Sequence, residues 1–318
     1  MRKMKELSVT YDSWEAAMED FLFQKESENL RPRTIEDYRS HISRFFRNHP
    51  EAFGGSKQAL TTAVKEHFSG TKSNNYFNGK LRTLSPFFRW LHSQGVIPCN
   101  PLENIKGKKQ TNRIVELSTE TLKELLQQPN RQTFAGLRDY TLMLTSIEVA
   151  ARPNELLSLT PNDYNFRSRE LIIREEHAKT HEQRTLPLLP QVANAINEFL
   201  RYRPDEWNSD VSIFCTEDGR KLAVESWGKK VKAYGKNIDV HVTPYMFRHA
   251  SALHHLRNGA DVFTVQRILG HADLNMTKRY LALTQSDVRE VHSLTSPVND
   301  ILNTGRKRVR SLAKQGKR

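Results

Sequence analysis

The chain has 318 residues, enough for one large domain or two smaller ones, and we expect two. Its 49 lysines and arginines outnumber its 36 acidic residues, and the formal charge of +13 favours a polyanionic partner. Nucleic acid is the leading candidate for this partner, and a membrane surface is the second. No apolar run reaches transmembrane length, no signal-peptide core follows the first residues, and two distant cysteines exclude a disulfide framework and a zinc ribbon.

Residues 1–97 have the periodicity of a small helical bundle, which is the first predicted domain. Apolar side chains recur at helical spacing in four segments, so each segment is expected to bury one face. The first predicted helix begins near Asp12 or Ser13, and the second is capped by Thr34, with Pro32 ending the segment before it. The third begins at Gln58, and the fourth follows Ser73 and stops at Gly95.

Residues 98–113 are rich in turn-forming and basic residues. Asn100-Pro101 and Gly107 disfavour regular structure, which predicts an interdomain linker. A flexible basic connector can neutralise the DNA backbone, although an ordinary solvated linker has the same composition. The candidate DNA-binding side chains are Lys106, Lys108, Lys109 and Arg113.

Residues 114–298 are expected to form a second domain, mostly helical with a small β-hairpin or sheet. The apolar runs at 171–174 and 184–188 predict two strands, and the polar loop between them contains Lys179. One helix is predicted after Ser118 and a second around residues 137–147. Four more are predicted at 192–200, 224–234, 244–256 and 262–269, and Gly270 is expected to stop the last of them.

The end of the chain is expected to carry one more helix and a tail. Ser286-Asp287 can cap a short helix with Val288, Val291 and Leu294 on one face, and Pro297 is expected to end it. Residues 299–318 form a basic C-terminal tail that is expected to contact DNA phosphates.

Short segments of the second domain place an arginine, a histidine and a tyrosine in a fixed order. The first segment, Ala151–Leu159, contains Arg152 and Glu155, and the second, Thr243–His249, contains Arg248. The third is Leu269-Gly270-His271 and the fourth is Thr277–Tyr280. Phosphodiester exchange without a metal needs cations on the phosphate, a proton donor for the leaving oxygen and a nucleophile, and these residue types can supply each. The order therefore suggests DNA strand transfer through tyrosine.

From about Arg113 to Pro297 the chain resembles the catalytic domain of the tyrosine recombinases, the family of phage and transposon integrases and chromosome-dimer resolvases. The family's A-R-x-x-E-L segment, strand-loop lysine, H-x-x-R helix, L-G-H segment and tyrosine each have a counterpart or near counterpart here. The resemblance implies site-specific recombination through a 3′-phosphotyrosine intermediate, without a metal or another cofactor. It assigns Arg152 and Arg248 as the phosphate clamp, Lys179 as the acid for the leaving 5′ oxygen, His271 as a phosphate donor, Glu155 as the orienting acid and Tyr280 as the nucleophile.

Tyr245 is a departure from the family pattern. It lies three residues before Arg248, where the family usually has histidine. A tyrosine can donate a hydrogen bond to a phosphate oxygen, but a phenol is a poor general base at neutral pH because its ordinary pKa is about 10. Removal of the nucleophile's proton is then left to Lys179, to water or to the phosphate.

Three other functions remain as alternatives. A non-catalytic DNA-binding protein of the same fold is disfavoured because Tyr280, Arg152 and Arg248 are all present. A metal-dependent nuclease would need clustered carboxylates, and Glu175 and Glu176 are unconvincing ligands. A type IB topoisomerase uses related chemistry, but the helical N-terminal bundle and the short tail favour a recombinase.

The resemblance also implies the partners. These are double-stranded DNA with paired recombination sites, further copies of the chain that form a tetramer on DNA, and accessory DNA-bending or directionality factors. The N-terminal bundle resembles the family's core-binding domain. A cytoplasmic, nucleoid-associated protein with no membrane partner is expected.

Overall fold

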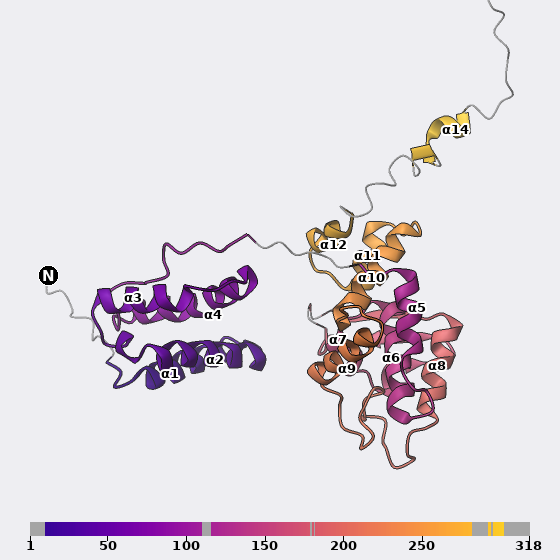
Figure 1. Cartoon of the computed structure of the whole chain (residues 1–318), viewed down its shortest axis with the longest axis horizontal. Coiled ribbons are helices and arrows are strands. Elements are labelled where there is room, and N and C mark those ends of the chain that lie inside the picture. Colours follow the sequence, from indigo (N-terminus) through magenta and orange to yellow (C-terminus); the bar gives the residue numbers. More distant parts are fainter. Residues whose placement is uncertain are drawn as a thin grey trace, which may run out of the picture. The chain divides into compact units, whose positions relative to one another are not determined.

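The computed structural model describes residues 10–109, 116–178, 180, 182–281, 292–293 and 295–301. Contacts divide the chain into two compact units, 1–113 and 114–318, and each has its own hydrophobic core (Figure 1). Both units are mainly helical, and a small antiparallel sheet accompanies the helices of the second, as the periodicity predicts. None of the helices in these described ranges is long and apolar enough to cross a membrane.

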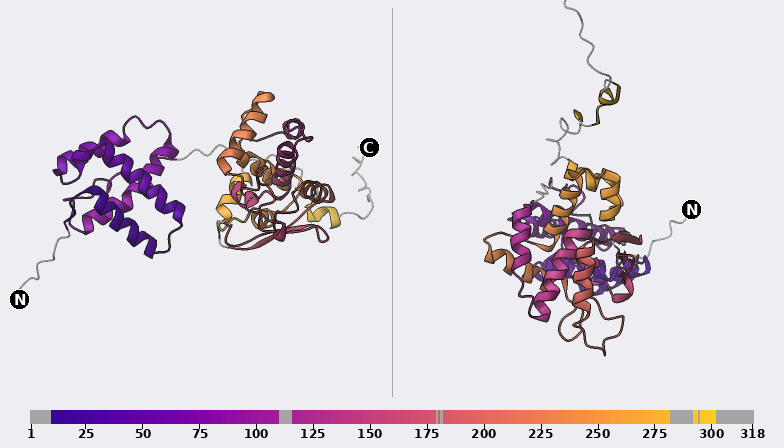
Figure 2. Two further views of the ribbon diagram at one scale, coloured as in Figure 1. Left: turned by 90° about the horizontal axis from the view of Figure 1, so that it is seen from below. Right: turned by 90° about the vertical axis from the view of Figure 1, so that its right-hand side faces the viewer.

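Between residues 10 and 109 the first unit is a bundle of the helices α1 to α4, built on aromatic side chains (Figures 1 and 2). Its elements are α1 (Trp14–Ser27), α2 (Pro32–Asn48), the short 3-10 helix η1 (Pro50–Ala52), α3 (Lys57–Phe68) and α4 (Asn74–Ser93). Phe45 of α2 and Phe88 of α4 are fully buried and meet edge to face, with ring centroids 5.3 Å apart. The apolar stripes therefore form the core of this unit.

The predicted start of α2 is wrong. Arg31 is the capping residue and Pro32 holds a helical position at the start of α2, so Thr34 lies inside the helix. Proline is tolerated there because its missing N–H would have no partner within the helix.

The basic segment after α4 packs back on the first unit. Leu102 is buried in the same core as the helices. Asn78 of α4 accepts a hydrogen bond from the Lys108 N–H (2.8 Å) and donates one to its carbonyl (2.7 Å). The Lys108 ammonium lies 4.3 Å from the centre of the Phe77 ring. As far as residue 109, the segment is therefore fixed along α4.

The second unit packs its helices around α6. Its elements are α5 (Thr119–Gln127), α6 (Phe134–Val149), α7 (Pro153–Leu157), the 3-10 helix η2 (Pro161–Asp163), α8 (Pro190–Leu200), α9 (Val224–Asn237), α10 (Pro244–Arg257), α11 (Val262–Leu269), α12 (Leu274–Leu281) and α14 (Pro297–Ile301). Helix α6 contacts both α8 and α10, while α11 contacts α12 (Figure 1).

The sheet has strand order β1-β2-β3 and is antiparallel throughout. Strands β2 (Glu170–Ile173) and β3 (Arg184–Pro187) form the predicted hairpin, and the two-residue β1 (Tyr164–Asn165) was not predicted. In β3, Leu186 is buried and Thr185 is exposed, so Arg184 shares the inward face with Leu186. This places Arg184 beneath α11, which β3 contacts.

The C-terminal expectations are only partly covered by the structure. His292, Ser293 and Thr295 are helical and Ser296 is not, so that helical stretch ends before Pro297, as predicted. Pro297 itself begins the short helix α14, which was not predicted, again at a position where proline needs no N–H partner. The predicted apolar face of Val288, Val291 and Leu294, and the tail from 302 onward, fall outside the described residues.

Candidate active site

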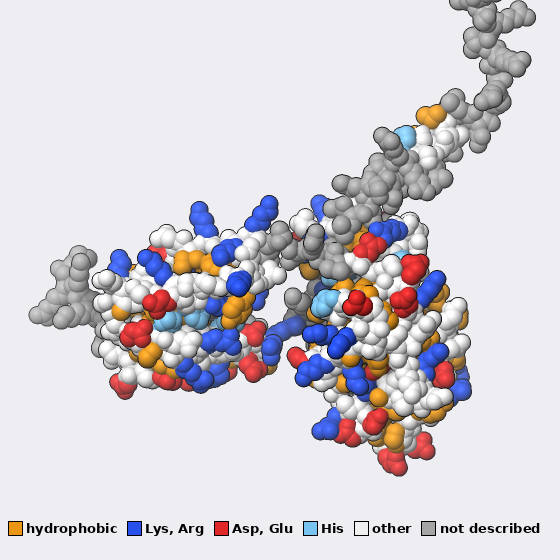
Figure 3. Space-filling view, in the orientation of Figure 1, with side chains coloured by type: hydrophobic (Ala, Val, Ile, Leu, Met, Phe, Trp, Pro, Cys, Tyr) orange, Lys and Arg blue, Asp and Glu red, His pale blue; other side chains and the backbone are white. Residues whose placement is uncertain are grey.

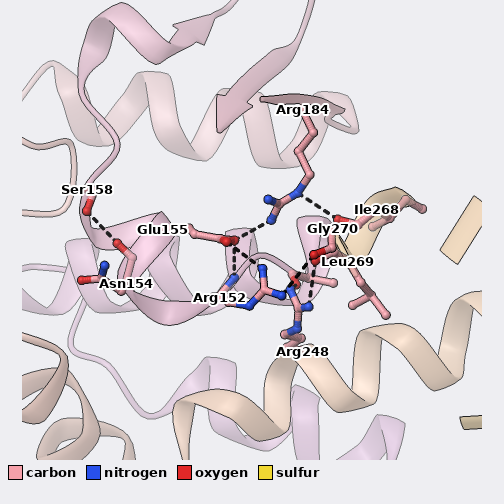
Figure 4. A network of polar contacts seen from close by, with 10 residues as sticks. Arg152, Asn154, Glu155, Ser158, Arg184, Arg248, Ile268, Leu269 and Gly270 are labelled. Carbon is pink, nitrogen blue, oxygen red and sulfur yellow. Dashed lines mark hydrogen bonds and ion pairs between the residues drawn. The ribbon is translucent and has the colours of Figure 1, made fainter. Parts of the chain in front are cut away.

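Three guanidinium groups converge on the C-terminal end of α11 (Figure 4). Arg184 Nε donates to the Ile268 carbonyl (3.2 Å), Arg248 Nη2 donates to the Leu269 carbonyl (2.8 Å), and Arg152 Nη2 donates to the Gly270 carbonyl (3.1 Å). The last carbonyls of a helix lack partners within the helix and carry partial negative charge. Three consecutive carbonyls therefore stabilise three neighbouring cations.

Gly270 makes this arrangement possible in two ways. It ends α11 in the left-handed region, with φ of 61°, which glycine adopts without strain. A Cβ at this position would also lie 2.8 Å from Arg184 Nη1, closer than carbon atoms approach such a group. The glycine of the L-G-H segment thus turns the chain and leaves room for Arg184.

Glu155 is the carboxylate of the cluster and is almost fully buried, with 1% of its surface exposed. It accepts hydrogen bonds from the Arg152 backbone N–H (2.9 Å), from Arg152 Nη1 (2.8 Å) and from Arg184 Nη2 (2.5 Å). Burial raises the pKa of Glu155, but the hydrogen bonds and charges of Arg184 and Arg152 outweigh it and leave the pKa below its ordinary value. The carboxylate is therefore ionised and holds both arginines.

Arg248 is the most enclosed cation that we assign to the site. Its Nη1 also donates to the carbonyl of Ala150 (2.6 Å), the residue that ends α6 in the left-handed conformation. Burial first, and then the charge of Arg152, lower the pKa of Arg248 to about 10. It remains a cation at neutral pH.

His271 lies beside this cluster in its neutral form. Its Nδ1 is 2.9 Å from Oγ1 of Thr277, the first residue of the T-K-R-Y segment. Burial, followed by the charges of Arg248 and Arg152, lowers the pKa of His271 to about 3. The imidazole is consequently uncharged at neutral pH.

Tyr280 of α12 is buried against the same residues, with 3% of its surface exposed. Its ring is stacked on that of His271, with centroids 6.5 Å apart. Its hydroxyl is hydrogen-bonded to Nδ1 of His249 (2.7 Å). Burial raises the pKa of Tyr280, and the charges of Arg248, Arg279 and Arg152 oppose that effect.

A cleft of about 840 Å³ opens beside the cluster. It lies between the β2–β3 loop, represented by Thr180 and Glu182, and the end of α11. Arg184, Gly270 and His271 line it, so the cleft brings solvent to the edge of the guanidinium cluster.

The other predicted site residues lie elsewhere or are not described. Tyr245, in the first turn of α10, is 50% exposed. The basic side chains of Lys106, Lys108 and Lys109 belong to the first unit. Lys179 and Arg113 fall outside the described residues.

Two residues of the cluster were not assigned from the sequence. Arg184 had a detectable signal, because a charged residue on the inward face of a strand needs a buried partner. Its Nη1 is buried without a hydrogen-bond partner in the part of the chain that is described. His249 had no such signal, because its partner Tyr280 lies 31 residues away in the sequence.

The described residues contain no group of three or more histidine, cysteine or acidic side chains arranged to hold a metal ion. Here the carboxylate of Glu155 is surrounded by arginines, whose positive charge opposes the binding of a second cation. The donor set of the cluster is therefore suited to an anion.

Comparison with known proteins gives a consistent result. The model of the phage integrase family matches residues 104–287. The tyrosine recombinase XerD of Lacticaseibacillus casei is 27% identical over 254 residues, which cover 78% of this chain and 84% of that protein. The tyrosine recombinase XerA of Pyrococcus horikoshii is 28% identical over 290 residues, which cover 90% of this chain and 95% of that protein.

Solved structures share the fold. The Tn1549 transposon integrase in complex with transposon right-end DNA superposes with a TM-score of 0.67 at 16% identity, over 84% of this chain and 94% of that one. The XerH site-specific recombinase bound to its palindromic difH substrate gives a TM-score of 0.66 at 20% identity, over 91% of this chain and 86% of that one.

Proposed function

Because the chain belongs to the phage integrase family and is a site-specific DNA recombinase of the tyrosine type, we propose that Tyr280 is its nucleophile. The observation that carries this proposal is the burial of Tyr280 against His271, within the field of Arg248 and Arg152. In the proposed reaction its hydroxyl oxygen attacks the scissile phosphorus, the bond to the 5′ oxygen breaks, and a 3′-phosphotyrosine forms. A second 5′ hydroxyl then reverses the step and joins new strands.

Arg152 and Arg248 are proposed to clamp the scissile phosphate. A guanidinium has five N–H groups, and the bonds to described residues use two in Arg152 and two in Arg248. The remaining N–H groups can donate to the non-bridging oxygens, where negative charge gathers in the transition state. Glu155 and the carbonyls of α11 hold both groups in place before DNA arrives.

His271 and Tyr245 are proposed to donate hydrogen bonds to the phosphate. In this proposal the Thr277 hydroxyl, 2.9 Å from Nδ1 of the neutral His271, donates to that nitrogen, so the imidazole proton is on Nε2 and can be donated to the phosphate. Tyr245 is exposed three residues before Arg248, so its hydroxyl can reach a bound backbone. Lys179 keeps its proposed role as the acid for the 5′ oxygen, since a hairpin loop can reach the groove beside the cleaved bond.

We propose double-stranded DNA with paired recombination sites as the partner. Lysine and arginine side chains are spread over the visible faces of both units (Figure 3), and the net charge of +13 favours the backbone of a duplex. The first unit would act as the core-binding domain, with Lys106, Lys108 and Lys109 on phosphates. We also propose that the chain forms a tetramer on two sites, that accessory directionality factors act with it, and that it associates with the nucleoid.

The test is a Tyr280→Phe variant on a duplex that the protein selects from random-sequence DNA. The wild type is expected to form an adduct that survives SDS, in excess chelator as well. The variant should bind the duplex with nearly unchanged affinity and form no adduct, because only one hydroxyl is removed. Tyr202→Phe, which changes an exposed tyrosine of the same unit, is the matched control and should form the adduct normally. An SDS-stable adduct with Tyr280→Phe would reject the proposal.

A further inference from the structure

The hydroxyl of the proposed nucleophile has one described hydrogen-bond partner, and it is His249. Nδ1 of His249 lies 2.7 Å from the Tyr280 hydroxyl oxygen, and the two ring centroids are 5.7 Å apart. The residues come from different helices, α10 and α12, which contact each other and share a small apolar core that includes Leu253 and Leu269. The contact is therefore set by tertiary packing.

The other described side chains near Tyr280 are poorer acceptors of its proton at neutral pH. Arg248 and Arg152 are cations with no lone pair to offer. Nδ1 of His271 already faces the Thr277 hydroxyl, 2.9 Å away. Tyr245 occupies the position at which the family usually has histidine, and a phenol is a poor base. His249 has an imidazole nitrogen directed at the hydroxyl itself.

We propose that His249 is the general base that removes the proton of Tyr280, a role that rests on the proposed function of Tyr280. In the cleavage step the Tyr280 O–H bond breaks as its oxygen forms a bond to phosphorus, and the proton passes to Nδ1 of His249. The bond from phosphorus to the 5′ oxygen breaks, and that oxygen takes a proton from a separate acid. In the joining step the imidazolium returns its proton to the departing tyrosine oxygen.

The charges around His249 fit this role. Burial, then the charges of Arg248 on its own helix and Arg279 on α12, lower the pKa of His249, so at neutral pH the ring is uncharged and has a lone pair. Of the residues that the structure describes, Tyr280 and the neutral His271 also lie beside it. A phosphate bound to Arg152 and Arg248 would offset their positive charge and make the imidazole more basic.

The transfer is unfavourable in the free protein, because burial also raises the pKa of Tyr280. It becomes favourable during attack, since a tyrosine oxygen that is forming an ester bond to phosphorus loses its basicity. The proton must therefore move in the same step as the P–O bond forms, which is the circumstance in which a positioned weak base accelerates a reaction.

The decisive variant is His249→Asn, because asparagine keeps a hydrogen-bonding group close to the position of Nδ1 without its basicity. Cleavage is measured in a single turnover on a nicked duplex carrying the selected site. We expect a loss of about 100-fold or more, with DNA affinity and thermal unfolding unchanged. The matched control, His255→Asn on the same helix, should cleave at the wild-type rate. A His249→Asn rate within about threefold of the wild type would show that His249 only positions the hydroxyl.

A substrate with sulfur in place of the 5′ bridging oxygen separates the base from the acid. A thiolate leaves without protonation, so this substrate should restore cleavage to a variant that lacks the acid. Because His249 acts on the nucleophile, the His249→Asn loss should persist on it. Full recovery would instead assign His249 to the leaving group and overturn the proposal.

A third measurement needs no DNA, and the His249→Asn variant serves only to identify the His249 signal among the 12 histidines of the chain. In the full chain labelled with ¹⁵N-histidine, we expect the His249 signal at pH 7 to report an unprotonated Nδ1 and a protonated Nε2. A protonated Nδ1 would mean that His249 donates to Tyr280, and the proposal would fail.

The failure of this inference can be told apart from the failure of the proposed function. If the wild type forms an adduct and Tyr280→Phe does not, Tyr280 is the nucleophile. Full activity of His249→Asn would then overturn only the role of His249 as the base.

Discussion

Glu155 decides the geometry of the guanidinium cluster. One carboxylate holds the backbone N–H and guanidinium of Arg152 and the guanidinium of Arg184. Removing one partner of a buried ion pair costs more than the pair contributes, because the remaining charges stay buried without compensation. We therefore expect the residue to affect both folding and the orientation of the Arg152 and Arg184 side chains.

We predict that Glu155→Gln lowers the free energy of unfolding at pH 7 by about 3 to 5 kcal/mol. The folded pKa of Glu155 lies below its ordinary value of 4.5, so its contribution is complete above about pH 4.5 and is lost as the pH falls through the folded value. Urea unfolding of both proteins should therefore show a difference that is constant near neutrality and shrinks in acid.

Glu124→Gln is the control for this measurement, since Glu124 is exposed on α5 and its replacement should change stability by less than about 0.5 kcal/mol. A Glu155→Gln difference that grows in acid would contradict the assignment of an ionised, paired carboxylate.

The sequence identifies some site residues and cannot identify others. Arg152 and Glu155 are three residues apart at a helix start, so their pairing follows from local spacing. Arg184 is an intermediate case, because its inward place in β3 is visible in the strand pattern but its contact with the end of α11 is tertiary. His249 follows Arg248 directly in the sequence, but only the packing of α10 against α12 brings it to the Tyr280 hydroxyl.

At the scale of elements, the C-terminal end of α11 organises the site. The helix ends at a glycine, and its last carbonyls bind Arg184, Arg248 and, through Gly270 itself, Arg152. The longer helices were predictable because apolar residues at helical spacing must bury one face, whereas the short η1, η2 and α14 carry no such pattern and were not predicted. Strand β1 was not, because two residues carry no periodicity and its pairing with β2 is tertiary. The start of α2 was misjudged because Pro32 both ends one segment and begins the next.

We predict that Gly270→Ala destabilises the protein more than Gly259→Ala. Both glycines have positive φ, 61° and 89°, so alanine at either costs about 1 kcal/mol in backbone strain. Only at Gly270 does the new methyl meet Arg184, whose guanidinium is held by Glu155 and the Ile268 carbonyl and cannot move freely. A Cβ at Gly259 has no neighbour within 4 Å.

Urea unfolding and single-turnover cleavage measure this difference. Gly259→Ala should lose stability and keep its cleavage rate, whereas Gly270→Ala should lose both. Equal effects of the two substitutions on cleavage would show that the approach of Arg184 to Gly270 has no part in positioning the site.

At the scale of the molecule, the two units have separate cores. Phe88 is fully buried in the first and Phe199 in the second. Each core brings together its own helices, so each unit should unfold in its own transition.

We predict that Phe88→Ala destabilises the first unit by about 3 to 5 kcal/mol and leaves the second unchanged. Phe199→Ala should do the reverse. Hydrogen exchange measured by mass spectrometry on peptides of the full chain resolves the two units. Loss of protection in both units with either substitution would contradict independent folding.

The charge of the whole chain is expected to govern DNA affinity, because each phosphate neutralised by lysine or arginine releases a counterion. Affinity alone cannot distinguish a recombinase from another basic DNA-binding protein. The chemistry at one tyrosine can, since a 3′-phosphotyrosine is a covalent product that binding does not generate.

The most direct test maps the covalent adduct. Wild-type protein is reacted with a nicked duplex carrying the selected site, stopped with SDS, digested with trypsin and nuclease, and analysed by mass spectrometry. Tyr280 and Tyr245 fall in different tryptic peptides, because Arg248 and Arg279 lie between them. We predict a nucleotide remnant on Tyr280. A remnant on Tyr245 or any other residue, or cleavage with no remnant at all, would contradict it.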